Sequence, residues 1–179
     1  MTTTDSKREK LAEFARNAVR RTIFEAVRDA GGEFIDRLIS ARHPDWGTTT
    51  DCTPADGLVA ARALELAASG KVREYMRRAR EDGMSWTAIG KLLNLQDEAK
   101  ALDVHVADVA FDIAAGPRDD HSWSERYFSW RCKDCGELLC DYGPEAYPEP
   151  GGRGGHKNGC KRLPIERRAY SAYCKERGW

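Results

Sequence analysis

The sequence has little hydrophobic continuity and no charge of one prevailing sign. No apolar stretch approaches the roughly 18 residues that a membrane-spanning helix needs, and the N-terminal stretch MTTTDSKREKLAEF has no apolar core of the secretory type. Lysine plus arginine equals aspartate plus glutamate, at 29 each, whereas a chain covered by nucleic acid is usually basic overall. These absences predict a cytoplasmic protein without a membrane span, in which the local distribution of charge matters more than its sum.

Catalytic arrangements are also missing. No paired carboxylates, Ser/His/Asp set or glycine-rich phosphate loop stands out in the sequence. The tripeptide HPD at 43–45 is a weak match to the H-x-E of zinc deaminases, because an aspartate stands where a glutamate acts and the later C-x2-C is far away. The sequence therefore predicts a binding protein rather than an enzyme.

Cysteines are few, six in 179 residues, and in a reducing compartment they favour metal binding or free thiols over disulfides. Cys132 and Cys135 form a C-x2-C knuckle, in which two thiolates can point at one ion, and Gly136 permits the turn. His156 and Cys160, spaced H-x3-C, complete a set of four ligands. We predict a structural zinc site at these four residues, since a closed tetrahedral set leaves no coordination position for catalysis.

The remaining cysteines have other interpretations. Cys140 is the main rival ligand, and its place on a predicted strand, on the same face as Leu138 and Tyr142, favours a small core residue. Cys52 and Cys174 have no partner at metal-ligand spacing and are predicted to be free thiols. The alternative for the predicted site is a group of reduced, unligated cysteines.

Hydrophobic spacing predicts a mainly α-helical chain. We expect helices over 5–30, 34–39, 53–69, 71–82, 85–93, 97–115 and 163–179, and strands over 126–132 and 137–143. The segment 42–52 is predicted to be a loop, because it is rich in proline, glycine and threonine. Thr53 should cap the helix that Pro54 begins, with Asp56 reaching back to the cap, and Gly70 should interrupt that helix.

A linker at 116–122, with the sequence GPRDDHS, is the predicted domain boundary. It would separate a helical domain at 1–115 from a zinc-finger domain at 123–179. In the second domain two strands flank the C-x2-C knuckle and a helix follows the second ligand pair. The expected fold is therefore an N-terminal helical domain plus a small zinc-binding ββα module.

Residues 71–115 resemble a helix-turn-helix of the sigma-factor region 4 type. The matching features are a helix, a GMSW turn, the short helix WTAIGKLLN and a third helix. The resemblance implies that Gly90 allows close helix approach. It also implies a buried seam formed by Trp86, Ile89, Leu92 and Leu93. With a zinc-ribbon or treble-clef-like finger downstream, the chain is similar to small uncharacterised regulators of high-GC bacteria and their mobile elements.

Charge is unevenly placed along this region. The third helix, 97–115, carries five acidic residues against Lys100, and phosphates would repel it. The preceding helix and the C-terminal tail are basic instead, so they could lie along a phosphate backbone, although the same charges could be solvated or paired with acids. The candidate nucleic-acid contacts are Arg73, Arg77, Arg78, Lys91, Lys161, Arg162, Arg167 and Arg168.

Two binding functions follow from these features. The first is a DNA-binding regulatory protein that contacts duplex DNA through the helix-turn-helix frame and the basic zinc domain. The alternative is a protein-interaction adaptor or inhibitor whose acidic third helix, 97–115, binds a protein partner. The sequence does not give the oligomeric state.

Overall fold

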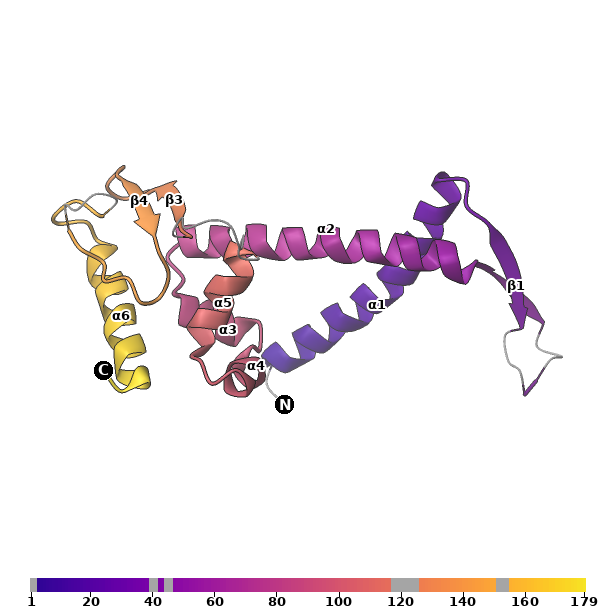
Figure 1. The fold of residues 1–179 in the computed structure, drawn as a ribbon, viewed down its shortest axis with the longest axis horizontal. Coiled ribbons are helices and arrows are strands. Elements are labelled where there is room, and N and C mark those ends of the chain that lie inside the picture. The colour runs from indigo at the N-terminus through magenta and orange to yellow at the C-terminus, as the bar shows by residue number, and fades with distance from the viewer. Residues whose placement is uncertain (1–2, 39–41, 44–46, 117–125, 151–154) are drawn as a thin grey trace. The chain divides into compact units, whose positions relative to one another are not determined.

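The computed structural model describes residues 3–38, 42–43, 47–116, 126–150 and 155–179 (Figure 1). The chain divides into two compact units, Met1–Ser69 and Gly70–Trp179. Within the described residues most of the chain is helical, and two antiparallel two-stranded sheets complete the secondary structure. The prediction of a mainly α-helical chain is thus confirmed.

The first unit contains a long helix, a hairpin and the beginning of a second long helix. These are α1 (Thr3–Asp29), β1 (Phe34–Leu38), β2 (Thr48–Cys52) and the N-terminal part of α2 (Pro54–Glu81). Among the described residues of this unit, Val27 is the one buried hydrophobic side chain, whereas Leu11, Phe14 and Leu66 are more than half exposed. This unit therefore buries little apolar surface by itself.

The hairpin corrects two sequence predictions. Residues 34–38 form a strand rather than a helix, and the predicted loop contributes its partner strand, with Phe34 opposite Cys52 and Leu38 opposite Thr48. The run of three threonines at 48–50 explains the difference, because β-branched side chains favour strands. The Phe34 ring packs against Phe24 of α1 at 4.7 Å, which gives the strand an apolar anchor.

The start of α2 agrees with the sequence. The Thr53 hydroxyl accepts from the Asp56 amide at 3.3 Å and donates to the Asp56 carboxylate at 3.0 Å, and that carboxylate also accepts from the Glu33 amide at 2.8 Å. Gly70, however, does not interrupt the helix, which is continuous to Glu81. A glycine inside a helix costs only about 1 kcal/mol, which neighbouring good helix formers can offset.

The second unit contains the end of α2 and six further elements. These are α3 (Trp86–Leu92), α4 (Gln96–Ala101), α5 (Val106–Ala115), β3 (Phe128–Arg131), β4 (Leu138–Asp141) and α6 (Leu163–Arg177). The Ser85 hydroxyl caps α3 by accepting from the Ala88 amide at 3.2 Å, as the sequence predicts. The strands and α6 give the expected ββα order.

The predicted third helix, 97–115, is two helices. Asp103 has a φ of 54°, and His105 then begins α5 with a reciprocal cap in which its side chain accepts from the α5 backbone and Asp108 accepts from the His105 amide. A left-handed residue followed by an N-cap ends one helix and starts another. The residue pattern had suggested continuity because apolar residues recur on both sides of this break.

The main core of the second unit joins helices α2, α3 and α5 to the finger. Its buried members are Met76, Trp86, Ile89, Ala107, Ala110, Phe111, Ala114 and Tyr173, with Phe128 partly buried against them. Because Tyr173 lies on α6 and Phe128 on β3, residues on both sides of the predicted boundary at 116–122 share one core. Of the predicted linker only Gly116 lies among the residues that the structure describes, and the two compact units meet at 69/70.

The packing of α3 against α5 tests the prediction that Gly90 allows close helix approach and that four side chains of this region are buried. A Cβ at Gly90 would lie 2.6 Å from the Val106 carbonyl oxygen, so glycine is what allows this approach. Trp86 and Ile89 are buried as expected, whereas Leu92 and Leu93 are 55% and 38% exposed. The seam prediction is wrong for these two leucines, because α3 ends at Leu92 and presents them away from the core.

Candidate metal centre

The β3–β4 hairpin holds the first pair of sulfur ligands. Strand β3 ends at Arg131, and the next residue, Cys132, donates its amide to the Glu137 carbonyl at 2.9 Å. The Gly136 amide donates to the Cys132 carbonyl at 2.8 Å, and Gly136 has a φ of 75°, which glycine adopts without strain. This closed turn directs Cys132 and Cys135 toward the same point, as the C-x2-C spacing predicts.

A second turn just before α6 holds the other two ligands. The Cys160 amide donates to the Lys157 carbonyl at 3.1 Å, and Gly159 has a φ of 82°. The Leu163 amide in turn donates to the Cys160 carbonyl at 3.3 Å, so the ligand turn leads directly into the helix. The start of α6 is therefore positioned by the turn that carries His156 and Cys160.

The four predicted ligands meet in space. The nearest ligand atoms of Cys132, Cys135, His156 and Cys160 all lie within 4.8 Å of one another. The Sγ atoms of Cys132 and Cys160 are 3.8 Å apart, and the His156 Nδ1 atom lies 3.7 Å from the Cys135 Sγ and 3.3 Å from the Cys160 Sγ. Tetrahedral zinc with bonds of about 2.3 Å to sulfur places neighbouring sulfurs about 3.8 Å apart. The cluster could bind a metal ion, and its geometry is compatible with zinc.

The thiols differ in how readily they ionise. Hydrogen bonds from the backbone amides of Glu137 and Lys157 lower the pKa of the Cys135 thiol to about 6, against the opposing effect of burial. Burial raises the pKa of the Cys160 thiol. Since the thiolate is the ligand form, Cys135 is ready to bind a cation at neutral pH, whereas Cys160 needs the ion itself to favour its ionised state.

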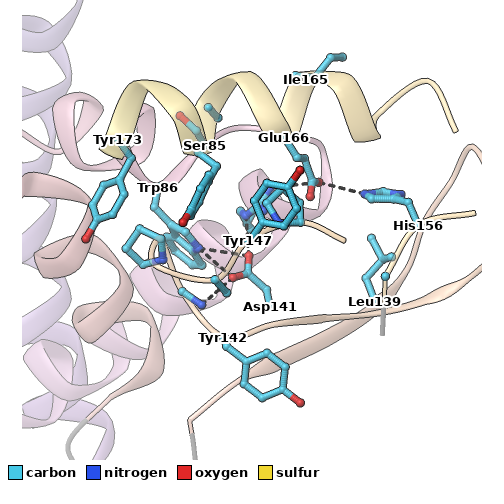
Figure 2. Close-up of a pocket in the computed structure, with 18 of the residues that line it drawn as sticks. Ser85, Trp86, Leu139, Asp141, Tyr142, Tyr147, His156, Ile165, Glu166 and Tyr173 are labelled. Carbon is cyan, nitrogen blue, oxygen red and sulfur yellow. Dashed lines mark hydrogen bonds and ion pairs between the residues drawn. The ribbon is translucent and has the colours of Figure 1, made fainter. Parts of the chain in front are cut away.

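A carboxylate behind the histidine completes the surroundings of the site. His156 is 2% exposed, and its Nε2 atom lies 3.3 Å from the Glu166 Oε1 atom in ion-pair range, without the geometry of a hydrogen bond (Figure 2). Carboxylates in this position fix the ring orientation of a metal-binding histidine. Sequence reasoning missed Glu166, and its place in the first turn of the predicted final helix was the available signal.

Glu166 also connects the site to α2. Arg80 of α2 pairs with Glu166 at 3.4 Å and with Asp141 of β4 at 2.6 Å, and all three side chains are nearly buried. The Trp86 indole and the Gly143 amide donate to the same Asp141 carboxylate, at 3.1 and 2.8 Å. A buried network of ion pairs and hydrogen bonds of this kind fixes the position of the finger on the helices of this unit.

Cys140 lies on the outer face of the hairpin. It shares that face with Leu138 and Tyr142, as predicted, but these two side chains are 50% and 44% exposed, while Leu139 and Asp141 face the core. The expectation of a core residue is therefore wrong for Cys140, which is half-buried. The predicted alternation of side chains along the strand is correct, but the buried face is the one that carries Leu139 and Asp141. Cys52 and Cys174 are free, as predicted.

Several candidate nucleic-acid contacts stabilise the fold. Arg162 is 9% exposed, and its guanidinium donates to the carbonyls of Glu81 and Arg80 at the end of α2. Arg77 donates to the Ala114 carbonyl at 3.1 Å and lies over the Phe128 ring. Burial therefore removes Arg162 from any contact with DNA.

The other candidate contacts are more exposed than Arg162. Arg167 donates to the Pro148 carbonyl at 3.4 Å, Arg78 pairs with Glu74 at 2.8 Å, and Lys91 lies 3.7 Å from Glu176. Arg73 is half-buried, whereas Lys161 and Arg168 are exposed. Seven of the eight candidates are therefore at least partly exposed, and four of these seven already contact a carboxylate or a backbone carbonyl.

Comparisons with protein families, curated proteins and solved structures gave no match to this chain. Among the described residues, no helix has the length and apolar character needed to cross a membrane.

Proposed function

We propose that the protein is a protein-interaction adaptor, with a zinc-fixed finger, that binds a basic partner protein through residues 92–104. This segment, called the acidic corner below, runs from the end of α3 through α4 to the residue before the cap of α5. The helix-turn-helix resemblance would then describe a frame used to bind protein rather than DNA. The finger would hold that frame in one conformation.

The exposed surface of the acidic corner is the observation that carries the proposal. Four large hydrophobic side chains are exposed there, with fractions of 55% for Leu92, 38% for Leu93, 61% for Leu102 and 39% for Val104. Exposed apolar patches that are rimmed by polar or charged residues often mark sites of protein–protein interaction. The rim consists of three exposed acids, Asp97, Glu98 and Asp103, against Lys100. A partner with apolar contacts and basic neighbours fits this pattern.

The same charges disfavour base reading by α4. In the helix-turn-helix interpretation the third helix would enter the major groove, yet its first part, α4, has six residues, and the exposed side chains of α4 include Asp97 and Glu98. Carboxylates near phosphates are repelled, and the arginines and amides that read bases are scarce here. Contact with protein is therefore the better use of this surface.

The structural role of zinc is the second part of the proposal. Three thiolates and one imidazole are the donor set of closed structural zinc sites. The ligands are carried on two turns that have no large core of their own, since the buried cluster around them consists of Trp130, Cys132, Leu139, Cys160 and Leu163. Metal binding would supply much of the folding free energy of such a small module.

The experiment compares capture of partners by matched variants. Tagged protein is expressed in the cells of origin, captured partners are identified, and the complex is rebuilt from purified components. Asp97→Lys with Asp103→Lys, and separately Leu102→Ser, should each abolish binding, because they remove the acidic rim or an exposed apolar contact. Arg168→Glu is the matched control and should bind like the original protein. If the three variants behave alike, the acidic corner is not the interface.

DNA-binding regulation remains a second candidate because Lys161, Arg168 and Lys175 are all exposed near or on α6. Arg168 and Lys175 are seven residues apart and share one face of the helix. Three phosphate contacts would make duplex affinity fall steeply with salt. A salt series of duplex binding, with Arg168→Glu as the test variant and Asp103→Asn as the control, separates this candidate from the adaptor.

A further inference from the structure

A cavity lies beside the finger, between the hairpin, its following loop and α6 (Figure 2). Its volume is about 360 Å³, within the usual range for ligand sites. All of its lining residues belong to the second unit. Aromatic and apolar side chains form most of the wall, among them Trp86, Trp130, Leu139, Tyr147, Tyr170 and Tyr173.

Charge in the cavity wall is predominantly negative. The lining carboxylates are Asp141, Glu149 and Glu166, and Arg80 is the one lysine or arginine among the lining residues. Arg80 is already paired with Asp141 and Glu166, at 2.6 and 3.4 Å. Among the lining residues that the structure describes, three carboxylates against one doubly paired guanidinium make the wall predominantly negative.

The carboxylates are placed at two depths. Asp141 is occupied by Arg80, Trp86 and Gly143, so it belongs to the fold. Glu166 is 11% exposed in its side chain and uses one oxygen, Oε1, for its contacts with Arg80 and His156. Glu149 is exposed at the rim. A ligand that enters the cavity therefore meets a carboxylate outside and can reach a second one inside.

Two ligand classes are excluded by this wall. A phosphate or nucleotide would need a cation or a row of backbone amides. Among the described lining residues the one lysine or arginine is Arg80, which is already paired with Asp141 and Glu166. A wholly apolar ligand would take Glu149 and Glu166 out of water without compensation, which is costly. A cation on an apolar stem satisfies both features, because its stem contacts the rings and its charge meets the carboxylates.

We infer that this cavity binds the side chain of an arginine or lysine supplied by a partner protein. The contact between Arg167 and Tyr147 supports the chemistry, since that guanidinium lies 5.5 Å from the ring centroid. The Tyr147 ring is half exposed. The site is separate from the acidic corner, whose residues do not line the cavity.

The test titrates the zinc-loaded full chain with short peptides of matched size. Gly-Arg-Gly and Gly-Lys-Gly carry the cation, Gly-citrulline-Gly has nearly the shape of the arginine peptide without its charge, and spermidine represents a free polyamine. Binding is followed by nuclear magnetic resonance of the tryptophan indole N–H groups. Trp86 and Trp130 line the cavity, whereas Trp179 does not line it and serves as the internal reference.

We expect the Trp86 and Trp130 signals to shift with the cationic peptides and to stay still with the citrulline peptide. Weaker binding of spermidine than of Gly-Arg-Gly would favour a protein side chain, and tighter binding of spermidine would overturn that assignment. Glu149→Gln should weaken Gly-Arg-Gly about fivefold, as for an exposed ion pair. Tyr147→Ala removes a ring that lines the cavity and keeps every carboxylate, so it should also weaken binding of Gly-Arg-Gly.

Asp103→Asn is the control variant, because it alters the acidic corner and leaves the cavity wall unchanged. It should bind Gly-Arg-Gly like the original protein. Equal binding of the arginine and citrulline peptides, or no shift with any cation at millimolar concentration, would refute the cavity assignment. Such a result would not contradict the proposal that the acidic corner binds a partner protein, because that experiment changes different residues.

Discussion

At the scale of single residues, position within the two turns decides which cysteines can hold the ion. Cys132 is 2% exposed and points into the ligand cluster, whereas the half-buried Cys140 lies on the other face of the hairpin. We predict that Cys132→Ser loses tight zinc binding and that Cys140→Ser retains one zinc per chain. Zinc released by denaturation and quantified with a chromogenic chelator measures this. Loss of zinc from both variants would place Cys140 in the site.

Two glycines should respond to alanine in opposite directions. An added Cβ at Gly90 would lie 2.6 Å from the Val106 carbonyl oxygen and 2.8 Å from its Cγ2, so Gly90→Ala should lower the free energy of unfolding by about 1–3 kcal/mol. Gly70 has open space around it inside α2, so Gly70→Ala should raise that free energy by about 0.5–1 kcal/mol. Urea unfolding curves of both variants give the comparison. Similar effects at the two positions would contradict the α3–α5 packing.

Residue spacing predicted the metal ligands well, because thiolate and imidazole spacing is a local property of two short turns. The residues that support them could not be predicted in the same way. Arg80 and Glu166 lie 86 positions apart and pair through tertiary structure. The error at Cys140 has the same origin, since alternation identifies which residues share a face but not which face is covered.

At the scale of elements, the end of α2 depends on a residue from the finger. The buried Arg162 guanidinium donates to the carbonyl of Glu81, one of the last carbonyls of α2, and at 3.5 Å to that of Arg80, which also accepts from the Gly83 amide. Arg162→Ala should lower the free energy of unfolding by about 1–3 kcal/mol, because buried acceptors lose their donor. Arg168→Ala, on the exposed side of α6, should change it by less than about 0.5 kcal/mol. Thermal unfolding of the two variants would distinguish a structural Arg162 from a surface one.

The packing of α6 should also make the fold sensitive to alkali. Burial, together with the hydrogen bond to Asp108, raises the pKa of the Tyr173 phenol above its ordinary value of about 10. The unfolded phenol therefore loses its proton first, and the stability that Tyr173 contributes below about pH 10 decreases as the pH rises beyond that value. Unfolding free energies between pH 9 and 11.5 should decrease more steeply in the original protein than in Tyr173→Phe. Equal slopes for the original protein and Tyr173→Phe would contradict this role of Tyr173.

Element prediction succeeded where local signals were strong. Ser85 and Thr53 caps, the glycines of the ligand turns and the alternation around Leu139 all act within a few residues. The break at Asp103 and the strand at 34–38 were missed, because a left-handed residue and a distant strand partner override the spacing of apolar side chains.

At the scale of the whole molecule, the shared core changes what the metal is expected to stabilise. Tyr173 of α6 is 2% exposed and lies in the same cluster as Trp86 and Phe111, and Arg80 joins α2 to the finger. A finger that folded by itself would leave the helices unaffected when the metal is removed. Here α6 cannot loosen without exposing Trp86 and Phe111, so the second unit should respond to the metal as a whole.

We therefore predict that chelation of zinc reduces hydrogen-exchange protection across α3, α5, β3, β4 and α6. Within the first unit, protection of α1 should stay unchanged, because no ligand or second-unit core residue lies there. Peptide-resolved hydrogen exchange with and without a chelator measures both outcomes, and re-addition of zinc should restore the original pattern. Cys140→Ser provides the matched control, since it keeps the ligand set and should respond to chelation like the original protein. Loss of protection limited to residues after 125 would instead indicate an independent finger, and the shared core would then contribute little to the coupling.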